Sequence, residues 1–229
     1  MPRRLRLTAL FIAMTALVAC GGGPPPDTGP EPDADSLAQA RADSIARADS
    51  IQRARERAAA SEELCEQASA ALEAGDYDEA RELYERAREA YPDTECAARA
   101  DDELSRIDVV QTVRERVHFD FDRATITDAA AETLERKAEV LRQHPELRIQ
   151  IAGHCDERGS NEYNMALGQR RAEAAMSYLV DLGVSEDRFE TISYGEERPL
   201  VNESNEQAWS MNRRSEFIIQ NMDALTTSE

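Results

Sequence analysis

Basic and aromatic residues are scarce in this chain of 229 residues. Lysine and arginine together number 27, against 46 aspartate and glutamate residues, so the formal net charge is −19. Nucleic acids and anionic lipid surfaces would repel so acidic a protein, which excludes both as main partners. Aromatic residues make up only 5% of the sequence, and no basic or aromatic stretch indicates a groove for a protein partner.

Histidine and cysteine are also few, with three and four residues. His154, Cys155 and Asp156 are consecutive, but neighbouring side chains of an extended segment point to opposite sides and cannot easily share one ion. The other histidines, His118 and His144, are distant in sequence. We therefore expect no metal, no cofactor and no catalytic thiol.

Long apolar runs are missing apart from one at the N-terminus. Three arginines precede the run Leu7–Ala19, which is too short to remain as a membrane-spanning helix and predicts a signal peptide over residues 1–19. The end of this run, Leu17-Val18-Ala19, together with Cys20 is similar to a lipobox, where bacterial lipoprotein precursors are acylated on the cysteine and cut before it. We expect lipidation of Cys20, because a plain signal peptide would leave it as a free thiol.

The residue after the cysteine bears on the membrane that receives the lipid. Gly21 stands where an aspartate often retains lipoproteins at the inner membrane. This favours the inner leaflet of the outer membrane, with the chain facing the periplasm. Cleavage would remove three arginines and change the net charge from −19 to −22.

Two segments without a core follow. Residues 20–35 contain too many prolines for a helix or strand, which predicts a solvated tether. In residues 36–61 the unit Ala-Asp-Ser-Leu/Ile repeats, and one large apolar residue every six to eight positions cannot build a core. We predict an exposed helical spacer there, with a weak coiled coil as the alternative.

Residues 62–110 resemble a tetratricopeptide helix pair. The similarity rests on Ala71-Leu72, Gly75, Tyr77, Ala80, Tyr84, Ala87 and Pro92. One repeat cannot normally bury its faces alone, so this region is either a structural stalk or a small docking module. Cys65 would begin the first helix and Cys96 the third, on neighbouring helices of the same direction. In an oxidising compartment a disulfide between them is expected, which leaves Cys155 unpaired.

Residues 112–222 alternate between strand and helix patterns, and we expect residues 223–229 to form a flexible tail. The four strands are expected at 117–121, 147–153, 188–194 and 216–220, and the helices at 127–144, 162–182 and 206–212. This order predicts an α+β fold, an α/β sandwich whose sheet is covered by helices on one face.

The most distinctive segment is GHCDERGSNEYNMALGQRRAEA, which begins at Gly153. At about 100° per residue, Arg171 projects between Leu167 and Ala175, inside the apolar arc of a helix. A buried guanidinium needs an anion, since an unpaired buried charge is costly. Asp156, at the mouth of the preceding strand, can reach it. The pair predicts either a salt bridge that fixes the loop or a ligand site.

This segment closely resembles the peptidoglycan-binding segment of the OmpA-like family, in particular that of the peptidoglycan-associated lipoproteins (Pal). VHFDFDRATI, ISYGEERP and AWSMNRRSEF resemble further blocks of that family in the same order. The resemblance implies a non-catalytic pocket for the meso-diaminopimelate residue of the peptidoglycan stem peptide. It assigns to this pocket the side chains of Phe121, Asp122, Asp156, Leu167 and Arg171, with backbone amides around His154 and Cys155.

The chemistry of these residues suits that ligand, whose free end carries an amine and a carboxylate. Asp156 would take the ammonium and Arg171 would bind the carboxylate with two N–H groups. Asp122 either shares the ammonium or only forms a turn. Neither Asp156 nor Arg171 has a nucleophile or base beside it, so we expect binding without catalysis.

Taken together, the sequence predicts an outer-membrane lipoprotein that anchors the membrane to peptidoglycan. Resemblance to Pal also implies a partner from the Tol system such as TolB, although the helical stalk is longer than the usual Pal tether. One alternative is an assembly scaffold, in which the helical region recruits a protein and the C-terminal domain only localises it. Another is a hydrolase using Asp156 or Glu157, which lacks a second converging carboxylate.

Three further features have expected structural roles. Asn164 is expected to fix the turn into the helix that follows. Trp209 is expected to pack the short helix on which it lies. Arg213 and Arg214 are expected to be surface or loop-bracing charges.

Overall fold

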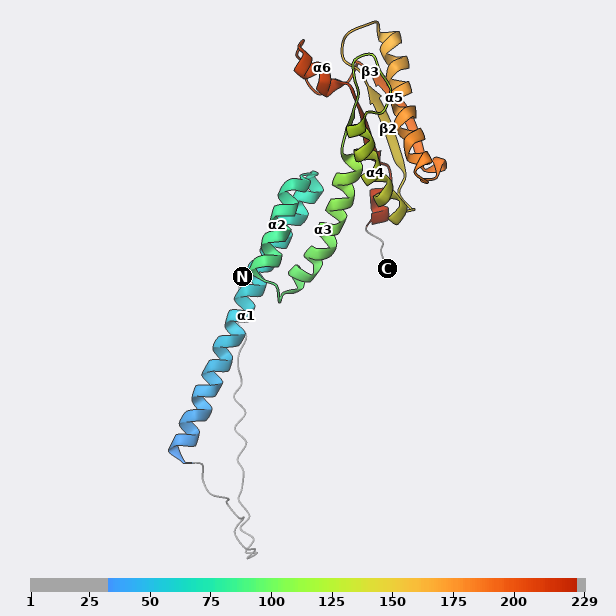
Figure 1. Cartoon of the computed structure of the whole chain (residues 1–229). Helices are drawn as coiled ribbons and strands as arrows, with labels where there is room; N and C mark the ends of the chain where they lie inside the picture. The colour runs from blue at the N-terminus through green and yellow to red at the C-terminus, as the bar shows by residue number, and fades with distance from the viewer. Residues whose placement is uncertain (1–32, 226–229) are drawn as a thin grey trace, which may run out of the picture. The chain divides into compact units, whose positions relative to one another are not determined.

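The computed structural model describes residues 33–225 (Figure 1). The predicted signal peptide, Cys20 and nearly all of the predicted tether lie outside this range. Contacts between residues divide the chain into two compact units, Met1–Ser50 and Ile51–Glu229. Each unit is described by itself below.

The described part of the first unit is helical. Helix α1 begins at Ala34 and runs to Ala74, so it includes the last two residues assigned to the tether and continues past the predicted boundary at residue 61. Asp33 explains the early start, because its carboxylate accepts a hydrogen bond from the Ser36 N–H group at 2.7 Å. Leu37 and Ile45 are 47% and 62% exposed, as their spacing predicted.

The second unit begins within α1 and adds helices α2 (Tyr77–Ala90) and α3 (Glu95–Arg114). Asp76 and Thr94 cap these helices by accepting hydrogen bonds from backbone N–H groups. Small side chains allow the helices to approach closely: Ala68, Ala80, Ala87 and Ala100 are fully buried.

The predicted pair of cysteines lies between two of these helices. The structure joins Cys65 to Cys96 by a disulfide with an S–S distance of 2.07 Å. Cys96 lies at the start of α3, as expected, whereas Cys65 lies inside α1 rather than at a helix start. The reason is that no glycine or proline interrupts the good helix formers upstream of Cys65.

The C-terminal end of α3 packs into the C-terminal domain. Val110 and Val113 belong to the hydrophobic core of that domain. Lys137 is fully buried, and its Nζ donates to the carbonyl oxygens of Thr112 at 2.7 Å and Val113 at 2.9 Å. These carbonyls have no partner inside α3, so Lys137 caps the helix where the domain begins.

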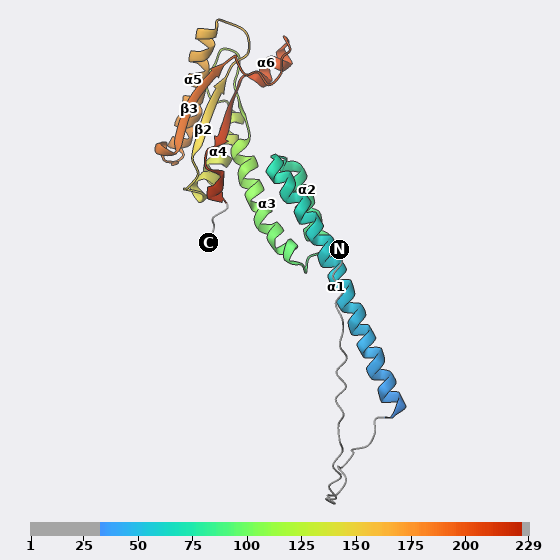
Figure 2. The same ribbon diagram turned by 180° about the vertical axis from the view of Figure 1, so that it is seen from behind.

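A four-stranded mixed sheet forms the C-terminal domain, as the sequence predicted. Its order is β1-β4-β2-β3, with β2 and β3 parallel and β4 antiparallel to both β1 and β2. Helices α4 and α5 cover one face, and the view from behind shows the strands in front of them (Figure 2). The bounds are β1 Val117–His118, α4 Asp128–Gln143, β2 Ile149–His154, α5 Asn161–Asp181, β3 Phe189–Gly195, α6 Glu206–Asn212 and β4 Arg214–Ile219.

The first strand and the tail differ from the prediction. Strand β1 ends at His118 instead of continuing to Phe121, because the chain turns at Asp122, whose φ of 55° lies in the left-handed region. The expected tail begins as the short 3-10 helix η2 (Met222–Leu225), and Leu225 is buried in the domain core. No helix within residues 33–225 is long and apolar enough to cross a membrane.

Candidate binding site

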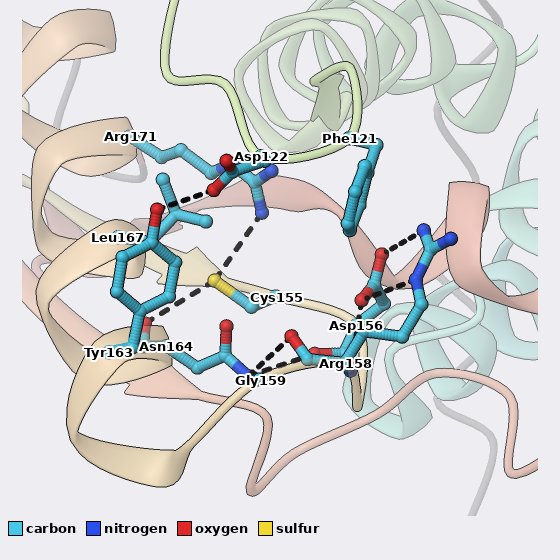
Figure 3. Close-up of a pocket in the computed structure, with 10 residues that line it drawn as sticks. All are labelled: Phe121, Asp122, Cys155, Asp156, Arg158, Gly159, Tyr163, Asn164, Leu167 and Arg171. Carbon is cyan, nitrogen blue, oxygen red and sulfur yellow. Dashed lines mark hydrogen bonds and ion pairs between the residues drawn. The ribbon is translucent and has the colours of Figure 1, made fainter.

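A cavity of about 240 Å³ lies where β2 ends and α5 begins, beside the turn that follows β1 (Figure 3). The cavity brings together all five side chains that the sequence assigned to a ligand pocket. It also includes residues that the sequence did not assign. The lining residues are Phe121, Asp122, Cys155, Asp156, Arg158, Gly159, Tyr163, Asn164, Leu167 and Arg171.

Arg171 is fully buried, as its place in the apolar arc of α5 predicted. Its guanidinium is held by three carbonyl oxygens: Nε donates to Arg123 at 2.8 Å, Nη1 to His154 at 2.7 Å and Nη2 to Asp120 at 3.0 Å. Nη1 also contacts the Cys155 sulfur at 3.4 Å. These bonds connect α5 to the end of β2 and to the turn after β1.

The salt bridge considered between Asp156 and Arg171 is absent. Within residues 33–225, Arg171 forms no ion pair, and its partners are neutral groups. The reason is that two other arginines hold the Asp156 carboxylate. Arg171 therefore provides a buried positive charge at the cavity without an anion of its own.

Asp156 is almost fully buried, at 4% exposure. Its carboxylate accepts hydrogen bonds from Arg158 Nη2 at 2.7 Å and Nε at 3.1 Å, and from Arg213 Nη1 at 3.2 Å. Burial alone would raise the pKa of Asp156, but the hydrogen bonds from Arg158 and Arg213 outweigh it and lower this pKa below the usual value. Asp156 is thus a carboxylate with two cationic partners.

Arg213 corrects one expectation. The sequence allowed it to be a surface charge, but it is buried, and it connects three segments. Its Nε donates to the Phe119 carbonyl at 3.0 Å, and Nη2 donates to Glu206 of α6 at 2.9 Å. Arg214, also expected at the surface or in a loop, is 2% exposed and bonds Glu216 at 2.8 Å. Of the two predicted roles, bracing fits both residues.

Trp209, expected to pack the short helix α6, contacts the loop that follows β2. Its Nε1 donates to the Glu157 carboxylate at 3.0 Å. The centre of its ring lies 4.2 Å from the guanidinium carbon of Arg158, which also lies 3.9 Å from the centre of the Phe121 ring. None of these contacts has a signal in the local sequence, because the partners are far apart along the chain.

Asp122 lies across the cavity from Asp156 (Figure 3). Among the described residues other than glycine, only Asp122 has a positive φ, so it does form the turn that one interpretation expected. Its carboxylate accepts a hydrogen bond from the Tyr163 hydroxyl, a partner that the sequence did not indicate. Of the two carboxylates that line the cavity, Asp122 is the one that no guanidinium holds.

Asn164 and Cys155 complete the lining of the cavity. Asn164 Nδ2 donates to the carbonyls of Asp156 and Arg158, both at 3.3 Å, and so fixes the turn as expected. Burial raises the pKa of the Cys155 thiol to about 11, which keeps it neutral. The Cys155 amide does not face a ligand as expected, because its N–H donates to the Gly195 carbonyl at 2.8 Å.

His154 makes a testable contribution to stability. It is 1% exposed, and neither ring nitrogen has a hydrogen-bond partner, although Nε2 lies 3.7 Å from Glu216. Burial lowers the pKa of His154 from 6.5 to about 4. The unfolded chain therefore binds this proton more readily than the folded chain between these pH values. The free energy of unfolding should fall by up to about 3 kcal/mol as the pH is lowered across this window.

Urea unfolding between pH 7 and pH 4.5 measures this effect. His154→Leu cannot be protonated, so its stability should depend less on pH than that of the wild type. His144→Leu, which replaces a histidine outside the core at the end of α4, is the matched control. Equal slopes for the wild type and His154→Leu would contradict the prediction.

Comparison with known proteins places this chain in a family. Residues 118–213 match the OmpA family model. The peptidoglycan-associated lipoprotein of Brucella melitensis is 44% identical over 112 residues, which cover 49% of this chain and 67% of that protein. The chain belongs to the OmpA family. A second relative, the peptidoglycan-associated lipoprotein of Rhizobium meliloti, is 44% identical over 115 residues, covering 50% of this chain and 65% of that protein.

The crystal structure of the peptidoglycan-associated lipoprotein from Burkholderia pseudomallei aligns with a TM-score of 0.45 and 42% identity, over 47% of this chain and 90% of that one. The OmpA family match begins at residue 118 and so leaves α1, α2 and α3 outside it.

Proposed function

We propose that this protein is a periplasm-facing lipoprotein of the outer membrane whose C-terminal domain binds peptidoglycan without catalysis. In this proposal the cavity takes the free end of the diaminopimelate residue of a stem peptide, and lipid on Cys20 holds the chain to the membrane. The OmpA family relatives are named peptidoglycan-associated lipoproteins, which supports the proposal of a lipoprotein that binds peptidoglycan. The buried charge of Arg171 is the observation that supports the ligand.

Arg171 calls for an anion inside the cavity. A guanidinium has five N–H donors, and its contacts with three carbonyls and one sulfur leave a further donor on Nη2. The carbonyls solvate the charge but do not neutralise it. A ligand carboxylate in the cavity would supply the missing negative charge at a site from which water is largely excluded.

Asp122, in contrast to Arg171, needs a cation inside the cavity. Its carboxylate has a hydroxyl donor but no cation, and it lines the same cavity as Arg171. A site with a free anion and a free cation suits a group that carries an ammonium and a carboxylate on one carbon. The free end of diaminopimelate is such a group, with Asp122 and Asp156 as acceptors for its ammonium and Arg171 for its carboxylate. Phe121 and Leu167 would enclose its methylene groups.

The cavity supports binding rather than chemistry. Cys155 stays protonated at neutral pH and donates its hydrogen to the Asn164 carbonyl. Asp156 is held by two guanidinium groups and is a poor base. A partner from the Tol system, such as TolB, is part of the proposal through the similarity to Pal alone.

Co-sedimentation with purified sacculi tests the proposal. The chain should pellet with sacculi whose stem peptides contain diaminopimelate and stay in solution with sacculi that contain lysine, which lacks the terminal carboxylate. Asp122→Asn should weaken retention about tenfold, because it removes a charged hydrogen-bond acceptor. Asp101→Asn, on the exposed side of α3, is the control. Equal retention on both kinds of sacculi, or no retention of the folded wild type, would refute the proposal.

A further inference from the structure

Arg158 already occupies the place that a ligand ammonium would need on Asp156. Its Nη2 and Nε donate to both carboxylate oxygens, at 2.7 Å and 3.1 Å, and its backbone N–H donates at 3.1 Å. This is the bidentate geometry in which guanidinium binds a carboxylate most strongly. With Arg213 on the same carboxylate, a further cation cannot bind Asp156 unless Arg158 leaves.

Apart from its bonds to the buried Asp156, Arg158 is held by groups at the surface of the domain. Its guanidinium lies between the rings of Phe121 and Trp209, and Nη1 lies 3.4 Å from Glu206. Phe121 is 53% exposed. Figure 3 shows the Arg158 side chain at the edge of the cavity, beside Phe121 and Asp156. Stacked and exposed contacts of this kind contribute modestly, so they hold the side chain without fixing it.

The contacts of Arg158 also connect the cavity to α6. Helix α6 supplies both Glu206 and Trp209, and Trp209 bonds Glu157, the residue beside Asp156. A movement of Arg158 away from Asp156 therefore changes the environment of the Trp209 ring. Asp156 itself would exchange one cation for another, so the exchange leaves its charge balanced.

From these contacts we infer that Arg158 is an internal competitor for the ligand ammonium. It binds Asp156 in the free protein, the ligand displaces it, and its release from between Phe121 and Trp209 transmits occupancy of the cavity to α6. This inference rests on the proposed function, because it concerns the same ligand. It assigns to Arg158 the role of setting the affinity of the site.

Trp209 provides the readout, since the chain has only one tryptophan. The full chain is titrated with a soluble muropeptide that contains diaminopimelate, and binding is followed by calorimetry and by tryptophan emission. Wild-type emission should change in proportion to occupancy. Arg158→Gln should bind about tenfold more tightly, since the competing charged hydrogen bonds are gone. Its emission should change little when the muropeptide binds.

Matched variants make the result decisive. Arg148→Gln, which removes an exposed arginine near Asp187, should bind as the wild type does. Trp209→Leu removes one stacking partner of Arg158 and should tighten binding by about threefold. This variant decides the question if Arg158→Gln does not fold, because unchanged or weaker binding would refute the inference.

The two proposals fail in different ways. Weaker binding by folded Arg158→Gln would show that Arg158 is a fixed part of the site, which overturns the inference and leaves the proposed function intact. Wild-type binding without a change in Trp209 emission would do the same. No binding by the wild type in calorimetry would overturn the proposed function, and the inference with it.

Discussion

Replacing Arg171 by methionine is expected to abolish binding of diaminopimelate-containing peptides, with a loss of at least about 100-fold. The reason is that Arg171 is the buried cation at the cavity, and it has no carboxylate partner within residues 33–225. A ligand carboxylate would lose its partner and also enter a cavity where Asp122 and Asp156 repel it. Calorimetric titration with a soluble muropeptide measures the loss.

The same substitution should destabilise the domain. It leaves the carbonyl oxygens of Asp120, Arg123 and His154 without the donors that they have now. The His154 bond is buried, whereas the other two are part-buried and the Asp120 carbonyl keeps the Arg123 N–H. A buried carbonyl without a partner costs about 1–3 kcal/mol, so the free energy of unfolding should fall by about that amount. Urea unfolding measures this fall, and the binding experiment is run at a temperature where the variant is still folded.

Two other substitutions separate the charge of Arg171 from its hydrogen bonds. Arg171→Lys keeps the positive charge but cannot reach three carbonyls, so its affinity and stability should lie between those of methionine and arginine. Arg170→Met removes the neighbouring arginine, whose side chain is exposed on α5, and should change neither quantity greatly. A folded Arg171→Met protein with wild-type affinity would contradict the assignment of Arg171 to the ligand.

Burial of Arg171 could be predicted from the sequence, but its partners could not. The 3.6-residue period places Arg171 in the apolar arc of α5, and this position depends only on local spacing. The partners are backbone carbonyls of Asp120, Arg123 and His154. Every residue has a carbonyl group, so no residue type marks these positions in the sequence. A carboxylate was therefore the natural but wrong expectation.

The arginines around Asp156 illustrate a second limit of prediction from the sequence. Arg158 is only two residues away, yet its local pattern is that of any charged loop. Arg213 is 57 residues away and lies in a pair of arginines that reads as surface charge. Both arginines reach Asp156 only when the fold brings the end of β2, α6 and the start of β4 together. Long-range ion pairs of this kind have no periodic signal.

The element order could be predicted because its signals are local. The predicted bounds of α6 agree with the structure, and α4 follows its Thr127 cap. Strand β1 was predicted too long because Phe119 and Phe121 share the parity of a strand. Phe119 is buried in the core, but Phe121 is 53% exposed, since the turn at Asp122 takes it to the cavity instead. Alternation alone cannot separate a core position from an exposed site residue.

Gly153→Ala is the substitution expected to destabilise the fold most. Helix α5 passes directly over β2 at this point, and a Cβ atom at position 153 would lie 1.8 Å from the carbonyl oxygen of Gly168. Both groups belong to backbone, because Gly153 is paired in the sheet and Gly168 lies inside α5. Neither side can rotate away, so α5 would have to move off the sheet.

The expected cost is about 4 kcal/mol or more, at the upper end for single substitutions, because overpacking against backbone cannot be relieved by a rotamer change. Gly168→Ala should cost about 3 kcal/mol, since its Cβ would meet the movable Ser193 Oγ at 2.3 Å before the Gly153 carbonyl at 2.9 Å. Gly75→Ala is the matched control. It has a φ of 80° but no atom within 4 Å, so only backbone strain of about 1 kcal/mol is expected.

Urea unfolding of the three variants measures the order Gly153→Ala, Gly168→Ala, Gly75→Ala, from the largest loss to the smallest. Equal losses for Gly153→Ala and Gly75→Ala would contradict the close approach of α5 to β2.

The close approach of α5 to β2 also matters for ligand binding. Leu167 and Arg171 lie on α5 on either side of Gly168, and Asp156 lies just beyond the end of β2 at His154. Gly153 and Gly168 therefore set the distance between Arg171 and Asp156. Folded Gly168→Ala should accordingly bind the muropeptide more weakly than Gly75→Ala.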